Sequence, residues 1–305
     1  MHAIFIFLFV AFRVIHFYIV SQFILLMANT FSQILNHQRA PDFLFRFPRI
    51  IFVYYVLNHL TALRMKYTRR AIRQVVTTMP SPKRIVDAGC GMGDFLFTVR
   101  EFQNGEQLIG LDVSQSNIDV CNCLMETLKK KNMKFVCSDL NAAEIPPQQD
   151  LIMCIAVIML MSDDKALLRK FRDALAPHGR LLLYAAVNYR RTLTLYKWFA
   201  QKKGFDYDEV IGRPQTYNDE ILEQRIKECG FVIEEKRHSF GIAAATMFEI
   251  SAIFEWLFKT WHPVLTLLLI PFYLIFYPLY LLSMFIDYHG TRATGNGVMI
   301  IAKKA

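Results

Sequence analysis

Three glycines and two aspartates lie within the segment VDAGCGMGDF, residues 86–95. Because glycine has no side chain, a backbone that contains it turns tightly and approaches a ligand closely, so Gly89, Gly91 and Gly93 indicate a ligand-binding loop. The loop follows an apolar run and precedes a predicted helix, which is the setting of nucleotide-type sites. A dinucleotide needs G-x-G-x-x-G, whereas the third position here is Asp94, and a carboxylate at a helix start repels a pyrophosphate. The segment therefore disfavours NAD.

Acidic residues also end the next two apolar runs. Asp112 lies at the end of QLIGLDV (107–113), and Asp139 ends MKFVCSD (133–139). Asp112 alone is weak evidence, because dinucleotide sites carry an acid at the same place. Together with Asp87, these residues form three strand-end carboxylates in order. The alternative is that all three are solvated and bind nothing.

The segment VDAGCGMG resembles motif I of the class I S-adenosylmethionine-dependent methyltransferases, in which an acidic residue stands two positions before G-x-G-x-G. The ligand of that family is cationic and has no phosphates, which suits an acid at Asp87. The resemblance covers roughly residues 80–240 and the last predicted strand. It implies S-adenosyl-L-methionine as the cofactor, with Asp112 on the ribose hydroxyls, Asp139 on the adenine amino group and Leu140 beside the ring. The cofactor-binding residues that it implies are Asp87, Ala88, Gly89, Cys90, Gly91, Gly93, Asp112, Val113, Asp139, Leu140 and Cys154.

The segment CIAVIMLMSDD (154–164) departs from the family. Related methyltransferases often carry an acid and a Glu-His pair there, but Ala156, Met159 and Leu160 occupy those places. No catalytic base is therefore assigned, and no metal site is expected. An apolar wall beside the methyl donor predicts an apolar acceptor. The alternative is that these side chains fill the core beneath the strand end. The candidate substrate residues are Ile158, Met159, Asn188, Tyr189 and Tyr217.

Strands and helices alternate from residue 84 onward. Short apolar strands with crossover helices predict a parallel sheet covered on both faces. The expected fold is α/β, a Rossmann-like seven-stranded methyltransferase sheet with helices on both faces and additional apolar membrane-associated helices. The expected strands are 84–89, 107–113, 133–139, 150–157, 179–187, 231–240 and 297–304, with helices at 50–78, 93–103, 114–130, 163–175 and 218–229.

The composition is unusually apolar, with 54% hydrophobic residues and a net charge of +9. The apolar residues collect at 3–27 and 241–286, which predicts a catalytic domain held at a membrane. Residues 36–73 hold eight Lys and Arg against Asp42 alone. Such a stretch beside an apolar helix indicates contact with anionic lipid headgroups. It also indicates that the catalytic domain lies on the cytoplasmic side of the membrane. Nucleic acid is the rival partner and is not expected, because no nucleic-acid motif is present.

The chain accordingly divides into five parts. These are an apolar N-terminal membrane anchor (1–35), a basic helical lead-in (36–80), the cofactor-binding domain (81–240), an apolar membrane-associated insertion (241–296) and a final strand (297–305). Residues 3–27 predict an uncleaved anchor that either spans the bilayer or lies in its interface. If the last strand joins the sheet, both ends of the insertion lie on one side of a membrane. A hairpin, a re-entrant element or an in-plane slab is then expected, with Pro263, Pro271 and Pro278 interrupting it. An unusually apolar lid is the alternative.

The leading hypothesis is a membrane-associated methyltransferase for an apolar acceptor: a lipid, an isoprenoid quinone or its precursor, or a long-chain aryl compound. One alternative is a membrane-anchored methyltransferase for a protein or a small soluble metabolite. The other is a non-catalytic cofactor-binding membrane assembly factor.

Overall fold

The structure is a computed structural model that describes residues 45–79, 83–98, 107–188, 191–202, 217–260 and 263–305. The predicted anchor at 3–27 and the candidate residue Tyr189 lie outside these residues.

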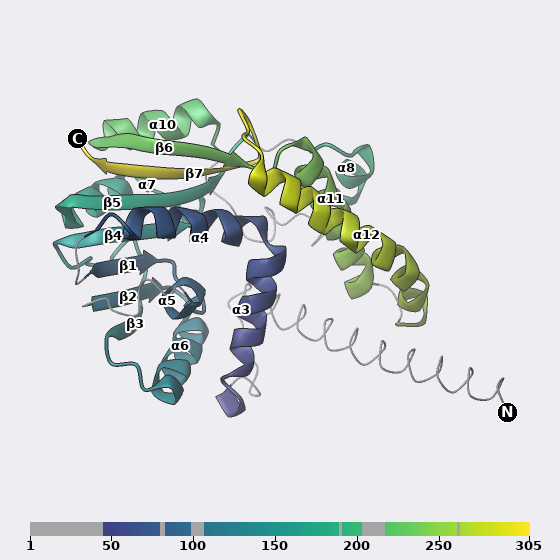
Figure 1. The fold of residues 1–305 in the computed structure, drawn as a ribbon, viewed down its shortest axis with the longest axis horizontal. Coiled ribbons are helices and arrows are strands. Elements are labelled where there is room, and N and C mark those ends of the chain that lie inside the picture. Colours follow the sequence, from purple (N-terminus) through teal and green to yellow (C-terminus); the bar gives the residue numbers. More distant parts are fainter. Residues whose placement is uncertain (1–44, 80–82, 99–106, 189–190, 203–216, 261–262) are drawn as a thin grey trace.

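Seven strands form one mixed sheet in the order β3-β2-β1-β4-β5-β7-β6 (Figure 1). Neighbouring strands are parallel from β3 to β5, and β7 is antiparallel to both β5 and β6. The predicted seven-stranded α/β fold is therefore confirmed, including the strand at 297–304. The strands are β1 Arg84–Ala88, β2 Gln107–Asp112, β3 Met133–Cys137, β4 Gln149–Ile155, β5 Leu175–Ala186, β6 Phe231–Ser239 and β7 Gly297–Lys304.

Strand boundaries differ from the predicted ones in places. β5 begins at Leu175 rather than at residue 179, because Leu175 already pairs with Gln149 across a register irregularity in the ladder. The first six strands, β1 to β6, each end one or two residues earlier than predicted, where the chain turns away from the sheet.

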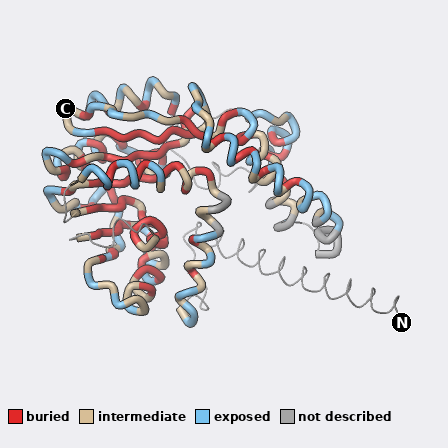
Figure 2. The backbone as a smooth tube through the Cα atoms, in the orientation of Figure 1, coloured by how far each residue is buried: buried red, intermediate tan, exposed pale blue. Residues whose placement is uncertain are grey.

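Helices cover both faces of the sheet. α4, α5 and α6 lie over one face, where Ile85 of β1 belongs to the same buried cluster as Ile72 of α4. α7 and α10 cover the other face, where Val86 packs in a cluster with Phe171. This alternation follows from the two-residue period of a strand, and Figure 2 shows the strands as the most continuously buried part of the molecule. The helices of the domain are α4 Leu63–Val76, α5 Asp94–Thr98, α6 Gln115–Leu128, the 3-10 turn η2 Ile158–Leu160, α7 Asp164–Ala174, α8 Thr194–Phe199 and α10 Asp219–Glu228.

The single helix predicted at 50–78 is wrong. The chain forms α3 Ile50–Thr61 and then α4, separated by Ala62 in an extended conformation with φ −91° and ψ 114°. α3 turns away from the sheet because its apolar side packs elsewhere: Ile51 and Tyr55 are buried in a cluster with Met92 and with residues of α6.

The insertion between β6 and β7 is a pair of helices, α11 Ile242–Thr260 and α12 Pro263–His289 (Figure 1). The expectation that prolines interrupt this run is wrong for Pro271 and Pro278, which lie inside α12. Both are exposed, so the carbonyl groups that they leave without an N–H partner lie toward the open side of the helix. By length and composition, Pro271–His289 is the one helical segment of the described residues that could cross a membrane.

Asp287 ties the base of this helical pair to the domain. Its side chain is 1% exposed, and its Oδ2 accepts the N–H of Gly241 at 2.8 Å. Its Oδ1 accepts the N–H of Phe240 and the hydroxyl of Tyr67, each at 3.2 Å. Arg292 supplies a compensating charge with Nε 3.4 Å from Oδ2. The end of α12 is therefore fixed to the start of α11 and to α4.

Candidate active site

The glycine loop joins β1 to α5 at the carboxyl edge of the sheet. Gly89, Gly91 and Gly93 have φ values of +84°, +54° and +82°, which other residues rarely adopt. The N–H groups of Gly89 and Cys90 both donate to the carbonyl oxygen of Leu111, at 2.7 and 2.9 Å. The loop is thus bound to the end of β2. It lies where the strand order reverses between β1 and β4, the usual ligand position in an open α/β sheet.

The three glycines do not have equal space around them. A Cβ at Gly89 would lie 2.2 Å from Cγ2 of Val157, whereas a Cβ at Gly91 would meet no heavy atom within 4 Å. Gly89 is therefore required by packing. Gly91 leaves open space above the loop.

Asp112 stands beside the loop at the end of β2. Its Oδ2 accepts the N–H of Gly91 at 2.8 Å. Its Oδ1 accepts the N–H of Ser114 at 2.9 Å and the side-chain amide of Asn117 at 3.1 Å. These bonds fix the orientation of the carboxylate, which has about four acceptor positions in total. Capacity remains for a hydroxyl group of a ligand.

Asp87 lies beneath the loop and is 1% exposed. Its Oδ2 is buried and has no hydrogen-bond partner in the described structure. Burial, and to a smaller extent the nearby carboxylates of Asp112 and Asp94, raise the pKa of Asp87 to about 8. A buried acid without a partner, next to two other acids, suits a cationic ligand, because a positive charge stabilises the ionised form. The sulfonium and ammonium groups of S-adenosylmethionine provide such a charge.

α3 contacts the loop from a distant part of the chain. The hydroxyl of Tyr55 donates to the carbonyl oxygen of Met92 at 2.5 Å. Nε2 of His59 lies 2.8 Å from Oδ1 of Asp94, the first residue of α5. Sequence reasoning missed Tyr55 and His59, because no local pattern links α3 to a loop more than thirty residues later.

The other predicted cofactor residues occupy different environments. Asp139 is exposed after β3 and accepts the backbone N–H of Asn141 at 2.9 Å, and Leu140 is buried beside it. Val113 is 58% exposed after β2. Ala88 and Cys154 are fully buried on the strands. The structure thus brings the loop and Asp112 into direct contact, and it places Asp139 at the same edge of the sheet.

Comparison with known proteins gives the class of this domain. A family model described as a methyltransferase domain matches residues 81–227. Residues 81–227 are a methyltransferase domain. The enzyme class and the cofactor predicted from the sequence, a methyltransferase that uses S-adenosylmethionine, agree with this match.

Curated relatives are distant. The chain is 24% identical over 107 residues to a ubiquinone biosynthesis O-methyltransferase of Stutzerimonas stutzeri, covering 35% of this chain and 45% of the relative. It is 24% identical over 181 residues to a demethylmenaquinone methyltransferase of Lactococcus lactis, covering 53% of this chain and 71% of the relative. The chain thus spans less than half of the first of these relatives.

A solved structure shares the fold of the methyltransferase domain. The geranyl diphosphate C-methyltransferase of Streptomyces coelicolor, in complex with Mg²⁺, geranyl diphosphate and S-adenosyl-L-homocysteine, superimposes with a TM-score of 0.52 at 13% identity. The match covers 79% of each chain.

The apolar segment after β4 lies mostly inside the methyltransferase domain. Ile158 is fully buried, and Met159 is 3% exposed, whereas Leu160 is 41% exposed. The described structure therefore gives Ile158 and Met159 core contacts. Their contact with an acceptor stays a prediction.

Tyr217 and Asn188 belong to one local structure of the methyltransferase domain. The N–H of Asn188 donates to the carbonyl oxygen of Tyr217 at 2.9 Å. Tyr217 is 5% exposed, and its hydroxyl donates to Oδ2 of Asp164 at 2.5 Å. Arg225 lies over its ring, 5.4 Å from the centroid. These contacts hold the ring in place and engage its hydroxyl, so a role in acceptor binding stays a prediction.

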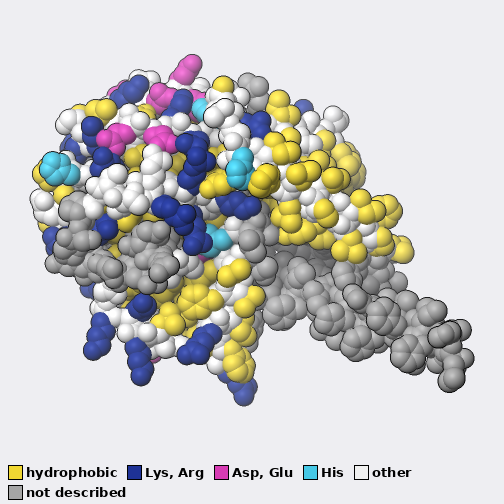
Figure 3. Space-filling view, viewed as in Figure 1, with side chains coloured by type: hydrophobic (Ala, Val, Ile, Leu, Met, Phe, Trp, Pro, Cys, Tyr) yellow, Lys and Arg dark blue, Asp and Glu magenta, His cyan; other side chains and the backbone are white. Residues whose placement is uncertain are grey.

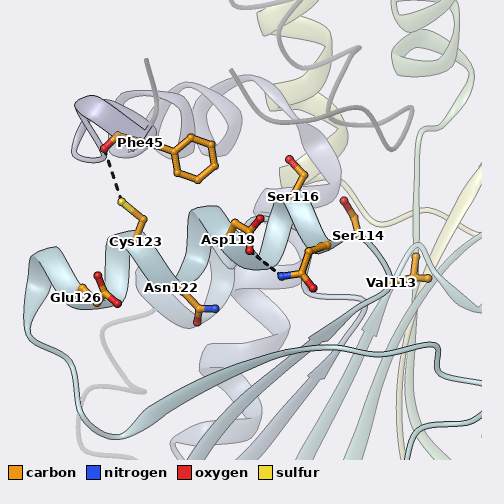
Figure 4. Close-up of a pocket in the computed structure, with 9 residues that line it drawn as sticks. Phe45, Val113, Ser114, Ser116, Asp119, Asn122, Cys123 and Glu126 are labelled. Carbon is orange, nitrogen blue, oxygen red and sulfur yellow. Dashed lines mark hydrogen bonds between the residues drawn. The ribbon is translucent and has the colours of Figure 1, made fainter. Parts of the chain in front are cut away.

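A groove of about 810 Å³ runs along α6 from the residue after Asp112 (Figure 4). Cys123 lies across it from Phe45, with Sγ 3.8 Å from the carbonyl oxygen of Phe45. Val113 is the predicted cofactor residue that lines the groove. The groove therefore lies next to the glycine loop, and no residue of that loop lines it. Its lining residues are Phe45, Val113, Ser114, Gln115, Ser116, Asp119, Asn122, Cys123 and Glu126.

Proposed function

We propose that this chain is an S-adenosylmethionine-dependent methyltransferase that acts at a membrane on an apolar acceptor. The observation that carries the methyl-transfer part is the glycine loop with the unpartnered carboxylate of Asp87 beneath it and Asp112 beside it. The apolar helical pair carries the membrane part.

The residues of the loop have separate tasks in this proposal. Bound S-adenosylmethionine supplies a methyl group already activated on a sulfonium. Asp112 would accept hydrogen bonds from the ribose hydroxyls, and the open space at Gly91 would let the ligand approach the backbone. Asp87 and Asp94 would supply negative charge that stabilises the cationic groups of the ligand. The protein thereby contributes alignment and exclusion of water, which is what an in-line displacement at an activated methyl requires.

No residue of the described chain is assigned as a general base. Val157, Ile158 and Met159 surround the position after β4 with apolar groups. A base is needed only where the nucleophile holds its proton. An acceptor that reacts as a carbanion or phenolate, or whose proton passes to water, is compatible with this wall.

The apolar surface and the names of the relatives support the proposed acceptor class. α12 exposes large apolar side chains along much of its length, which a soluble acceptor does not require. Two relatives have names that refer to ubiquinone biosynthesis and to demethylmenaquinone. A lipid, an isoprenoid quinone or precursor, or a long-chain aryl compound is accordingly the proposed acceptor, reached from the membrane surface.

The first test is calorimetric binding of S-adenosylmethionine and S-adenosylhomocysteine to the detergent-solubilised protein. Asp112→Ala is expected to weaken binding by about tenfold or more, since hydrogen bonds to a charged group contribute ~1.5–3 kcal/mol each. Asp173→Ala is the matched control, because Asp173 is an exposed carboxylate on α7. Absence of binding in folded wild-type protein would overturn the proposal.

The second test concerns the acceptor. Membrane lipid extracts are incubated with the protein and with S-adenosylmethionine that carries a deuterated methyl group. Mass spectrometry is expected to detect the label in an apolar product. Cofactor binding without S-adenosylhomocysteine formation would favour a non-catalytic assembly factor, and label confined to protein or water-soluble metabolites would favour the other alternative.

A further inference from the structure

α12 is apolar on both sides, but only one side is covered. Three buried residues recur at helical spacing on one side: Phe276, Tyr280 and Met284. They belong to the same buried cluster as Ile72 of α4 and Ile85 of β1. Phe276 also contacts Phe254 of α11, with ring centroids 5.4 Å apart. This side of α12 therefore has its packing partners within the domain.

The opposite side forms a continuous row, termed the outer stripe. Its spacing alternates between four and three residues, so its members lie on one side of the helix. Each is at least half exposed, and Ile275 reaches 70%. A surface helix in water normally carries polar residues at these positions. The outer stripe consists of Leu268, Phe272, Ile275, Leu279, Leu282 and Ile286.

A cationic helix adjoins the end of α12. α4 contains five Lys and Arg residues and no acid. Lys66, Arg70 and Arg73 lie at helical spacing on its outer side, where Arg70 and Arg73 are exposed and Lys66 is half-buried. Figure 3 shows Lys and Arg side chains over α4 on the same face as the apolar side chains over α11 and α12.

Direct contacts fix α4 against α12. The guanidinium of Arg70 lies 5.6 Å from the ring centroid of Tyr288, in the last turn of α12. The hydroxyl of Tyr67 donates to the carbonyl oxygen of Asp287 at 2.9 Å. Tyr67 and Tyr288 also meet edge to face, with centroids 5.6 Å apart. The cations and the outer stripe are thus held in one spatial relation.

We propose that the outer stripe and the cationic side of α4 form one docking surface for a bilayer that contains anionic lipids, with α12 lying in the plane of the interface. This inference rests on the proposed function and names its partner. The outer stripe enters the acyl-chain boundary, and Lys66, Arg70 and Arg73 contact the headgroup phosphates.

The connections of the helical pair argue against a single crossing and agree with an in-plane position. α11 begins directly after β6, and α12 returns to β7, so both ends stay at the sheet. Asp287 binds the N–H groups of Phe240 and Gly241, which holds the two ends together. A single crossing of the bilayer by α12 would separate them. Shallow insertion of one side satisfies both the connections and the exposed apolar groups.

The test maps the lipid contact directly in the full chain. The protein is bound to vesicles of phosphatidylcholine with or without phosphatidylglycerol, each containing a phosphatidylcholine with a photoactivatable diazirine in its acyl chain. After illumination, crosslinked peptides are identified by mass spectrometry. Crosslinks on α12 at residues of the outer stripe are expected, with a higher yield on vesicles that contain phosphatidylglycerol. Crosslinks confined to residues 3–27 would overturn the proposal, and so would the absence of lipid crosslinks on α12 in protein that is bound to the vesicles.

Charge reversal tests the contribution of α4. Lys66→Glu, Arg70→Glu and Arg73→Glu are combined, and the yield of crosslinks on α12 is expected to fall by roughly fivefold for each cation removed. The matched control combines Lys130→Glu, Lys131→Glu and Lys134→Glu, which changes the net charge equally beside β3, at the opposite edge of the sheet. An equal effect of both triple variants would refute a specific role of α4.

The wild-type crosslink positions test the stripe even if the α4 variant does not fold, which circular dichroism would detect. Cofactor binding in detergent does not involve this surface. Failure of the docking surface and failure of the proposed methyl transfer are therefore distinguishable.

Discussion

Gly89 and Val157 lie so close that a methyl group at Gly89 would be 2.2 Å from Cγ2 of Val157. One residue follows β1 and the other follows β4, the two strands at which the strand order of the sheet reverses. The apolar segment after β4 therefore supports the glycine loop from below. This contact links the segment that departs from the family pattern to the loop that retains it.

The first prediction compares Gly89→Ala with Gly91→Ala. Gly89→Ala is expected to lower the free energy of unfolding by roughly 2–4 kcal/mol, because overpacking against Val157 adds to a left-handed backbone. Gly91→Ala meets open space and is expected to cost only ~1–2 kcal/mol, yet to weaken S-adenosylmethionine binding about tenfold or more. Thermal unfolding and calorimetry check both values. Undiminished affinity in Gly91→Ala would place the cofactor elsewhere.

The second prediction concerns the pH dependence of stability without ligand. The pKa of Asp87 is about 8 in the folded chain against an ordinary value of 3.8, first because of burial and then because of Asp112 and Asp94. Between these values the folded chain holds a proton that the unfolded chain has lost. Stability should therefore fall as pH rises from about 4 to about 8. Asp87→Asn is expected to flatten this slope in unfolding curves, and an unchanged slope would assign it to other groups.

The same carboxyl predicts a proton release on binding. A cationic ligand favours the ionised form of Asp87, so binding near pH 7 should release up to about one proton. Calorimetry in two buffers with different ionisation enthalpies measures this number. Asp87→Asn should release fewer protons, whereas equal release in both proteins would contradict the assignment.

The third prediction concerns Glu249, a 2% exposed residue of α11. Its carboxylate accepts the N–H and the hydroxyl of Thr192, at 2.7 and 2.8 Å, and the N–H of Leu193 at 2.7 Å. It thereby holds the two residues that directly precede α8, whose N-cap residue Leu193 makes no side-chain cap hydrogen bond. Glu249→Gln should lower the free energy of unfolding by ~1–3 kcal/mol. The side-chain NH₂ group of glutamine would replace one acceptor oxygen and would face a backbone N–H, which is itself a donor.

Hydrogen exchange of α8 localises that effect. The amides of Thr194–Phe199 are expected to exchange faster in Glu249→Gln than in wild type. Glu220→Gln, at an exposed glutamate of α10, should leave them unchanged. Unaltered exchange of α8 in Glu249→Gln would show that the buried cluster around Tyr196 and Phe199 suffices to hold it.

The fourth prediction concerns the base of the helical pair. Asp287→Ala leaves the N–H groups of Phe240 and Gly241 without their acceptor, and it should lower the free energy of unfolding by about 2–4 kcal/mol. Denaturant unfolding measures this value. Asp173→Ala, at an exposed residue, should change it by less than ~0.5 kcal/mol. A small effect of Asp287→Ala would show that water replaces the carboxylate.

Sequence patterns predicted the sheet well, because buried parallel strands appear as short apolar runs and local turns separate them. All seven strands were expected, with Leu175 as the largest error at a strand start. That error arises from pairing with Gln149, a contact made across the sheet. Local pattern therefore predicts that a strand exists more reliably than where it begins.

The candidate site was predictable only in part. The glycine spacing identified the loop, and Asp112 followed from its place at the end of a strand. No local sequence pattern predicts the pairing of His59 with Asp94. It depends on the turn at Ala62, which directs α3 toward the loop. Pro271 and Pro278 predicted an interruption that the structure does not have. They lie on the exposed side of α12, where the helix tolerates the absence of their backbone N–H groups. In both cases tertiary packing decided the outcome.

The position of β7 between β5 and β6 also has a consequence for biosynthesis. β6 takes its place in the sheet only through β7, which follows α11 and α12 in the chain. The ribosome therefore synthesises the apolar helices α11 and α12 before it synthesises β7, the strand that completes the sheet. β6 can therefore join the sheet only after α11 and α12 have left the ribosome, so the outer stripe is already part of the exposed chain when β6 first gains its neighbour.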